Sequence, residues 1–432
     1  MRSEQALRSW RAIEALRAGV PNRDAVRALG SSQPAIEQRF RDQLKDLMEA
    51  LSHGEPGDGL LIAGDFGTGK SHLLEHLQHI ALESNFVCSK VVISKETPLY
   101  DQAKVYTAAI EAAKVPDSSD AALVAIATKL TDGGFDKPEY DRFRHWVDRP
   151  DNGLSSRFAA TVFVFQRGGG MNNAEIADRL IQFWSGSRLP VSDLKAWLKE
   201  SGEAATYNLG KVSEKELARQ RYSFTPQLIL AAGYAGWVLL VDEVELIGRY
   251  SLRQRGKSYA EIARHMGKLQ EGGNPGLTSV LAISASFESE VLYERRDEET
   301  IPNRLRAGLG SDDPLLASQA ERGMRIISRE RVLLEQPTDV VIHDITEKVR
   351  SIYAEAYGWS PPTDYDLNKT LRMRQHLRRL ISGWDLKRLY PDHDVDIAVD
   401  EITEDYTVNR DLETPTDEEN GTGYSGVTDS NT

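Results

Sequence analysis

The feature that most constrains this chain is a glycine-rich turn between an apolar segment and a helical one, at residues 60–77. Residues 60–63 are apolar and predict a short strand, and residues 64–71 read GDFGTGKS, which matches G-x-x-x-x-G-K-[ST]. Glycine lets the backbone turn so that successive N–H groups point at one anion. The periodicity after the turn predicts a helix, whose N-terminus adds positive potential. The sequence therefore predicts a phosphate-binding loop.

Each part of this loop has a predicted role in holding a nucleoside triphosphate. The backbone cradle comprises Gly64, Asp65, Phe66, Gly67, Thr68 and Gly69. Lys70 is expected to reach the β- and γ-phosphates, and the Ser71 hydroxyl to bind a magnesium ion. The alternative is an ordinary glycine turn with a solvated lysine, but strand, glycines, Lys-Ser pair and helix rarely coincide by chance. We therefore predict ATP and Mg2+ as cofactors.

A second candidate site element is a pair of carboxylates at the end of an apolar run. Residues 237–241 read WVLLV and predict a buried strand, which Asp242 and Glu243 follow directly. Asp242 is expected to hold the magnesium shell, and Glu243 to polarise the attacking water as general base. Apolar strands ending in Asp-Glu are common, but the phosphate loop upstream favours the functional interpretation. Glu243, Lys70 and Asp242 are thus the predicted catalytic residues.

Three further segments are predicted to be strands of the same sheet. They are residues 86–94, 279–284 and 324–329. A strand, a tight loop, a helix and a second strand open a parallel α/β domain, which binds ligands beyond the carboxyl ends of its strands. In an ATPase sheet, the strand at 279–284 lies between the phosphate-loop strand and the strand that ends at Asp242. Ser284 or Ser286 then either senses the γ-phosphate or simply closes the strand.

The periodicity divides the chain into six regions. They are an N-terminal helical collar (1–54), the first part of the α/β core (55–99), a helical insertion (100–233), the second part of the core (234–336), a C-terminal helical lid (337–395) and an acidic tail (396–432). The insertion is too long for a loop and must carry its own structure. Its aromatic residues are expected to form a core rather than a base-stacking platform: Phe143, Trp146, Phe158, Phe163, Phe165, Phe183, Trp184 and Trp197.

Arginines outside the two motifs supply further candidates. The helix expected over 370–381 is basic, and its Arg374 or Arg378 would lie on the nucleotide, on a DNA backbone, or in solvent. Arg374 is the nucleotide-binding candidate that we retain. An arginine-rich segment lies between the later strands and contains Arg295, Arg296, Arg304, Arg306 and Arg322. There are two alternatives. One of these arginines reaches the site of a neighbouring subunit, as in ring-forming ATPases, or all of them are solvated.

Composition and local sequence patterns bear on how the chain could bind DNA and on the cellular compartment that suits it. The net charge of −13 argues against indiscriminate nucleic-acid binding by the whole surface. Residues 24–36 have a faint helix-turn-helix rhythm, but helix–Gly–helix is also common in plain helical packing, and we favour a helical collar packed on the core. A single cysteine, Cys88, excludes an internal disulfide and suits a reducing cytoplasm. No run approaches ~18 consecutive apolar residues, so we expect no membrane span.

The order of these elements resembles AAA+ ATPases of the origin-recognition branch. More narrowly, the sequence resembles the ATP-binding proteins of BREX bacteriophage-defence systems, the BrxC/BrxD group, with BrxD as the nearer branch. The stretches that carry the resemblance are residues 12–23, 64–74, 91–100 and 235–246. The Ser284 segment lacks the asparagine that many AAA+ proteins have there, and a minimal AAA+ domain has no counterpart to the insertion.

The resemblance implies a cytoplasmic ATPase that works beside other defence proteins, including a helicase-type partner, and with DNA. Three hypotheses follow. ATP turnover remodels or recruits a DNA-associated defence complex; or ATP is turned over slowly as a switch that scaffolds the helicase partner; or the chain is an ATP-gated DNA-binding initiator or regulator. An ATP-dependent homo-oligomer is expected under the first.

Overall fold

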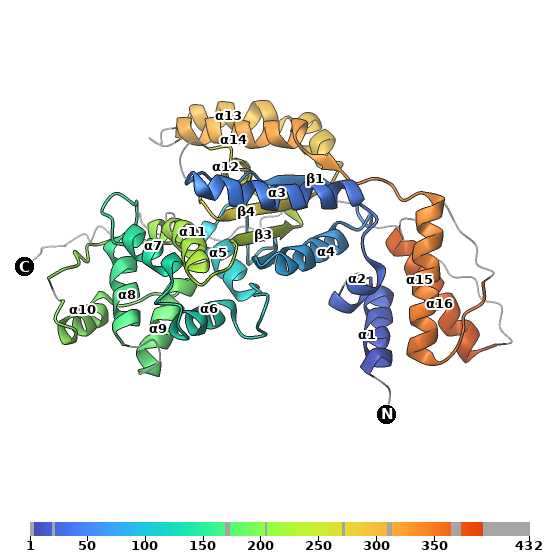
Figure 1. The fold of residues 1–432 in the computed structure, drawn as a ribbon. Helices are drawn as coiled ribbons and strands as arrows, with labels where there is room; N and C mark the ends of the chain where they lie inside the picture. The colour runs from blue at the N-terminus through green and yellow to red at the C-terminus, as the bar shows by residue number, and fades with distance from the viewer. Residues whose placement is uncertain are drawn as a thin grey trace, which may run out of the picture.

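The structure is a computed structural model that describes residues 4–19, 22–168, 173–203, 205–269, 273–308, 313–363 and 373–391. A parallel sheet lies at the centre, with helices on both faces (Figure 1). No helix in these ranges is both long enough and apolar enough to cross a membrane. The acidic tail predicted over 396–432 lies outside the described residues.

Five strands form the sheet, in the order β2-β3-β4-β1-β5. They are β1 (Leu60–Ala63), β2 (Val87–Val92), β3 (Trp237–Asp242), β4 (Leu277–Ile283) and β5 (Val332–Leu333). All neighbouring pairs are parallel, and Leu61 of β1 is in register with Leu281 of β4. The predicted parallel α/β fold is confirmed, and β4 lies between β1 and β3 as expected.

Alternate residues of each strand enter two different cores because successive strand side chains point to opposite faces. Leu60 and Ile62 pack against α3 (Pro34–Ser52) and α4 (Lys70–Glu83), while Leu61 and Ala63 face the opposite side. Both faces of β1 and β3 are therefore buried, and this explains why these two strands are apolar almost throughout rather than alternating. The phosphate loop follows β1, an inner strand between β4 and β5, and the Gly64 N–H at its start donates to the Ile283 carbonyl at the end of β4.

The chain between β2 and β3 is helical. It contains α5 (Gln102–Glu111), α6 (Ala122–Thr131), α7 (Pro138–Val147), α8 (Ser156–Arg167), α9 (Ala174–Ser185), α10 (Val191–Glu200) and α11 (Glu214–Ala231). Five of the eight aromatic residues predicted to form a core are buried, and Trp146, Phe163 and Trp197 pack partly buried against them. The core interpretation of these aromatics is confirmed.

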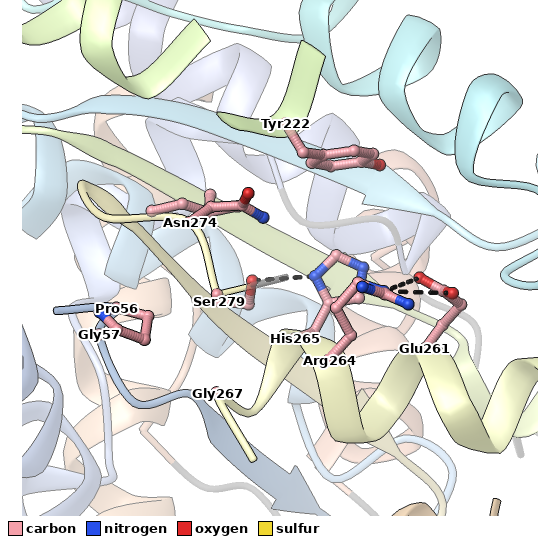
Figure 2. Close-up of a pocket in the computed structure, with 11 residues that line it drawn as sticks. Pro56, Gly57, Tyr222, Glu261, Arg264, His265, Gly267, Asn274 and Ser279 are labelled. Carbon is pink, nitrogen blue, oxygen red and sulfur yellow. Dashed lines mark hydrogen bonds and ion pairs between the residues drawn. The ribbon is translucent and has the colours of Figure 1, made fainter. Parts of the chain in front are cut away.

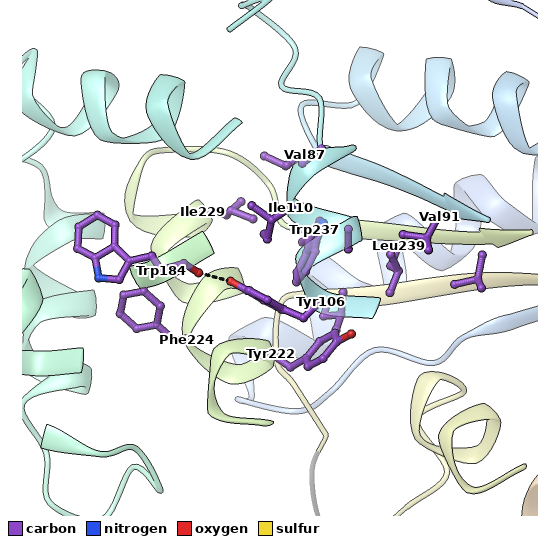
Figure 3. Close-up of a cluster of buried hydrophobic side chains, with 14 of the residues drawn as sticks. Val87, Val91, Tyr106, Ile110, Trp184, Tyr222, Phe224, Ile229, Trp237 and Leu239 are labelled. Atoms are coloured by element: carbon purple, nitrogen blue, oxygen red, sulfur yellow. Dashed lines mark hydrogen bonds between the residues drawn. The ribbon is translucent and has the colours of Figure 1, made fainter. Parts of the chain in front are cut away.

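This helical region shares its core with one face of the sheet (Figure 3). The Tyr106 hydroxyl of α5 donates to the Trp184 carbonyl of α9 at 2.7 Å, and the Tyr106 ring packs edge-on against Trp237 of β3. The indole N–H of Trp237 in turn donates to Ser89 Oγ of β2 at 2.9 Å. The helices are thus continuous with the sheet that holds the phosphate loop.

The segment after β3 corrects one prediction. It contains the 3-10 helix η1 (Val244–Arg249), α12 (Leu252–His265), the π-helix η2 (Glu288–Glu294), α13 (Asp297–Arg306) and α14 (Asp313–Arg329). The strand predicted over 324–329 is wrong, because these residues end α14. Buried Ala317, Ala320, Met324 and Ile327 follow helical spacing, and a Cβ at Gly323 would lie 1.9 Å from the Tyr259 carbonyl oxygen of α12. The fifth strand is the short β5 that follows.

Helices from the two ends of the chain form one module beside the sheet. α1 (Glu4–Ala18) and α2 (Arg23–Leu29) pack with α15 (Asp339–Tyr357) and α16 (Met373–Leu389), as Figure 1 shows. Their apolar core is separate from both cores of the sheet and includes Ile13, Leu29, Tyr353 and Ile381. The structure therefore divides the residues of the predicted collar: α3 covers the sheet, and α1 and α2 belong with the C-terminal helices.

A partly buried polar network joins α1 to the C-terminal helices. Arg17 Nε and Nη2 donate to the two Asp385 carboxylate oxygens at 2.9 and 3.0 Å, and Nη2 also donates to the Tyr357 hydroxyl at 3.0 Å. The Tyr353 hydroxyl donates to Asp385 Oδ1 at 2.7 Å. A bidentate arginine with this many partners fixes the relative orientation of helices as well as holding them together. We call α1, α2, α15 and α16 the composite lid.

Two chain segments join the composite lid to the sheet, and Gln33 ties them to each other. Its side-chain amide donates to the Glu335 carbonyl oxygen at 2.9 Å and accepts from the Glu335 N–H at 2.9 Å. Gln33 precedes α3, and Glu335 follows β5. The two connections to the composite lid therefore lie side by side.

Candidate functional site

The phosphate loop has the backbone geometry of an anion cradle. Gly67 and Gly69 have φ of 79° and 105°, in the left-handed region where a side chain is strained. A Cβ at Gly64 would lie 2.7 Å from Thr68 Oγ1. α4 begins directly after Gly69, so the N–H groups of its first turn have no partner within the helix. The loop can therefore offer several donors to one phosphate group.

Lys70 is held at the start of α4 by two oxygen atoms. Its side chain is 6% exposed, and Nζ donates to the Gly64 carbonyl at 2.8 Å. Nζ also lies 3.4 Å from Glu245 Oε1, a carboxylate of η1. The ammonium thus lies beneath the cradle, within reach of a phosphate bound there.

The two predicted carboxylates lie at the carboxyl end of β3, next to the loop. Asp242 is 2% exposed and accepts the N–H of Glu243 on Oδ1 at 3.0 Å. Glu243 has φ 58° and ψ 35°, a left-handed conformation that costs a non-glycine residue about 1 kcal/mol or more. Left-handed backbone of this kind is typical of functional sites, where it directs a side chain that a regular strand end would turn away.

A cavity of about 250 Å3 lies between the phosphate loop and the composite lid. Lys70, Ser71 and Glu243 line it on the side of the loop, and its polar lining also includes Asp344 and Lys348 of α15. Its apolar lining comes from Phe66 and Leu73 beside the loop, Ala15 and Leu16 of α1, Leu29 of α2, Leu334 after β5, Val341 and Ile345 of α15, and Met373 and Leu377 of α16. A lining that combines polar groups beside the loop with apolar side chains suits a nucleotide, which has charged phosphates and a largely apolar base.

Arg374 of α16 extends over the loop. Its guanidinium carbon lies 5.5 Å from the centre of the Phe66 ring, and its Nε is buried with no hydrogen-bond partner in the described part of the chain. Arg378, the alternative, is exposed and is not among the described lining residues. The structure therefore brings Arg374, and not Arg378, to the cavity.

Ser284 and Asp242 are close to the loop but set back from the cavity. Ser284 is buried after β4, with its hydroxyl 3.2 Å from the Ser286 hydroxyl, and the neighbouring Ala285 N–H donates to the Gly64 carbonyl. Neither Ser284 nor Asp242 is among the described residues that line the cavity. Both residues therefore lie in the strand ends that support the loop, and neither faces the cavity.

The arginine candidates for a neighbouring site differ in their surroundings. Arg295 is part-buried and donates to the Gly248 carbonyl at 2.5 Å, with Asp297 4.0 Å away. Arg296 pairs with Glu299, and Arg306 with Glu321. Arg295 thus helps to hold the segment after Glu243 in place, which is an intramolecular role.

Glu245 is the site residue that the sequence interpretation missed. Burial raises the pKa of its carboxyl to about 7, against the opposing effect of Lys70, and the charge of Glu243 raises it further. The available signal was its position three residues after Asp242, within the Asp-Glu-Val-Glu run. One turn of 3-10 helix brings that position back beside the strand end.

Magnesium would be held mainly by the nucleotide. In the ranges that the structure describes, no three His, Cys, Asp or Glu side chains cluster as a metal site. Mg2+ commonly takes one or two protein oxygens together with phosphate oxygens. Ser71 lines the cavity and Asp242 lies behind it at the end of β3, and both carry the hard oxygen donors that Mg2+ takes.

A second, much smaller pocket lies at the opposite end of the sheet strands (Figure 2). Its volume of about 20 Å3 suits a single water. Tyr222, Glu261, Arg264, His265 and Ser279 surround it, and the His265 ring nitrogen Nδ1 lies 3.2 Å from Ser279 Oγ. Burial, with a smaller effect of Arg264, lowers the pKa of His265 to about 4. We regard this pocket as structural.

The low pKa of His265 predicts a pH dependence of stability. The folded state keeps the ring neutral while the unfolded chain protonates it near pH 6.5. The contribution of His265 is therefore complete above pH 6.5 and is lost as pH falls towards 4, by roughly 3 kcal/mol. Urea unfolding of wild type and His265→Gln at pH 7 and pH 5 measures this. The wild type should lose more stability than the variant between the two; equal losses would contradict the assignment.

Together, the fold and the site define a nucleotide-binding α/β protein of the P-loop class. Comparison with protein-family models gives the family: the model described as BREX system ATP-binding protein BrxC/D matches residues 5–132 and 222–378. The match spans well over half of the chain, so the chain belongs to this family of BREX defence proteins. It does not separate BrxC from BrxD. No curated protein matches the chain.

The family match also bears on the helical region between β2 and β3. It leaves out residues 133–221, which contain α7, α8, α9 and α10. It includes both nucleotide motifs and the composite lid as far as residue 378. The elements that form the cavity thus lie within the family match.

Proposed function

We propose that this protein is an AAA+-type ATPase of a BREX defence system, which uses ATP turnover to remodel or recruit a DNA-associated defence complex. The observation that carries the hydrolysis is the meeting of Lys70, Glu243 and Arg374 at one cavity, from three distant parts of the chain. Other proteins of the system, including a helicase, are the proposed partners. The position of β4 between β1 and β3 supports the AAA+ assignment.

The chain's own groups divide the work at this cavity. The loop N–H groups and Lys70 would bind the phosphates, and Glu243 would accept a proton from the attacking water. Arg374 would add positive charge at the phosphates from the lid side. Magnesium, held by Ser71 and Asp242, would supply charge neutralisation at the transferring phosphoryl group. The apolar side chains of the composite lid would surround the base and exclude water from it.

The test is ATP turnover by the purified protein, with and without duplex DNA, at two salt concentrations. We expect turnover that DNA stimulates, and stimulation that weakens as salt rises, because phosphate contacts release counterions. The ATP turnover of Lys70→Ala, measured in the same way, gives the background rate. A protein that does not turn over ATP would contradict the hydrolase proposal. ATP turnover that DNA does not change would contradict direct coupling to DNA but would leave the hydrolase proposal intact.

A second candidate is a slow nucleotide switch or an ATP-gated DNA-binding regulator. The composite lid favours it, because ATP bound in the cavity would contact α1, α2, α15 and α16 at once and so bias the position of both chain ends. Such a protein would bind ATP tightly and release product slowly. Single-turnover measurements beside steady-state ones would separate this candidate from a remodelling motor.

A further inference from the structure

Glu245 and Lys70 form a buried ion pair inside the proposed ATP site. Both side chains are less than one-tenth exposed, and Glu245 Oε1 lies 3.4 Å from Lys70 Nζ. The remaining Glu245 oxygen, Oε2, is buried and makes no hydrogen bond in the described part of the chain. A carboxylate in this state depends on Lys70 for its compensation, since burial of an unpaired charge is costly.

The same ammonium is the group that the phosphates of ATP require. Lys70 has three N–H donors, of which one serves the Gly64 carbonyl. A triphosphate arriving in the cradle brings several negative charges close to Glu245, to which Asp242 and Glu243 already add like charge. Glu245 and the nucleotide therefore compete for Lys70, and each repels the other.

We propose that Glu245 is an internal counter-anion that occupies Lys70 and must yield it to the phosphates of ATP. This inference rests on the proposed ATP binding and assigns Glu245 a positioning role, because it acts through Lys70. Its consequence is that Glu245 weakens ATP binding while it stabilises the protein without nucleotide. A residue that merely orients Lys70 towards the phosphates would have the opposite effect on affinity.

The first test is calorimetric titration with ATP at pH 8, comparing wild type with Glu245→Gln. Glutamine keeps the shape of the side chain and removes its charge. We expect ATP to bind about tenfold more tightly to the variant, in line with the strength of one charged hydrogen bond. The matched control is Glu261→Gln, another buried carboxylate, which lies in the small pocket at the opposite end of the sheet. This control should bind ATP as wild type does.

The second test needs no nucleotide binding. Lys70→Met and Glu245→Gln should each lower the melting temperature of the nucleotide-free protein, because each leaves one charged or polar partner buried alone. The double variant should melt no lower than either single variant, since a buried pair replaced as a whole costs little. Additive losses of melting temperature would show that Lys70 and Glu245 do not stabilise the protein as an ion pair.

The two tests separate this inference from the proposed function. Weaker or unchanged ATP binding by Glu245→Gln, with wild type binding ATP, would overturn the competition with phosphate. Wild type that does not bind ATP would overturn the proposed function and, with it, this competition. Non-additive melting temperatures in that case would still establish the Lys70–Glu245 pair.

Discussion

Lys70→Ala should abolish ATP binding, weakening it by at least about a hundredfold. Lys70 is the buried cation beneath the cradle, and its removal leaves the phosphates of ATP beside Glu245, Asp242 and Glu243 without compensation. Titration with a fluorescent ATP analogue measures the loss. The fold should survive, because Lys70 lies at the first turn of α4 and does not contribute to either apolar core of the sheet.

A matched control for this variant is available on the surface. Lys45 of α3 is exposed and forms a surface pair with Asp42 at 3.6 Å. Lys45→Ala should therefore bind ATP as wild type does, since exposed pairs contribute little. If Lys70→Ala binds ATP within a few-fold of the wild-type affinity, the loop is not the phosphate site.

Glu243→Gln should retain ATP binding and reduce hydrolysis by roughly a hundredfold or more, the usual contribution of a general base. Glutamine keeps the size of the side chain, so the cavity and the left-handed backbone at this position are preserved. Binding titration and phosphate release, measured on the same preparation, separate the two effects. Hydrolysis at the wild-type rate would remove Glu243 from the mechanism.

The same variant reports on oligomerisation, because it should hold ATP without consuming it. Light scattering with ATP should show a larger mass for Glu243→Gln than the nucleotide-free protein has. A strictly monomeric variant would refute a role for any arginine acting in a neighbouring site. Glu290→Gln, an exposed carboxylate beyond β4, is the control and should behave as wild type.

The strands and motifs near the sheet could be predicted because each is encoded in a few adjacent residues. Gly64–Ser71 combines its turn, its cation and its helix start within one loop, and Trp237–Asp242 is apolar until the last position. The strand predicted over 324–329 was wrong for a related reason. A six-residue window with two adjacent isoleucines suits both a strand and the end of an amphipathic helix, and only the longer spacing from Ala317 favours the helix.

Other features could not be predicted because they depend on contacts between distant segments. The periodicity of α1 indicates an apolar face but not whether α3, the sheet or α15 covers it. Gln33 carries no local signal, since its role is to pair with the backbone of Glu335. Arg374 and Arg378 were equivalent in the sequence, and the packing of α16 on α1 brings only Arg374 to the cavity.

The shared core of the composite lid has a consequence for how the protein is made. Leu29 and its apolar neighbours leave the ribosome first, but their partners from Ile345 onwards follow about 300 residues later. At ordinary rates of synthesis, α1 and α2 wait roughly 15 to 60 s with an uncovered apolar face. A chain that stops before α15 carries a complete phosphate loop but lacks the part of the cavity wall that α15 and α16 supply. The wall of this cavity is therefore complete only once the chain has been translated through α16.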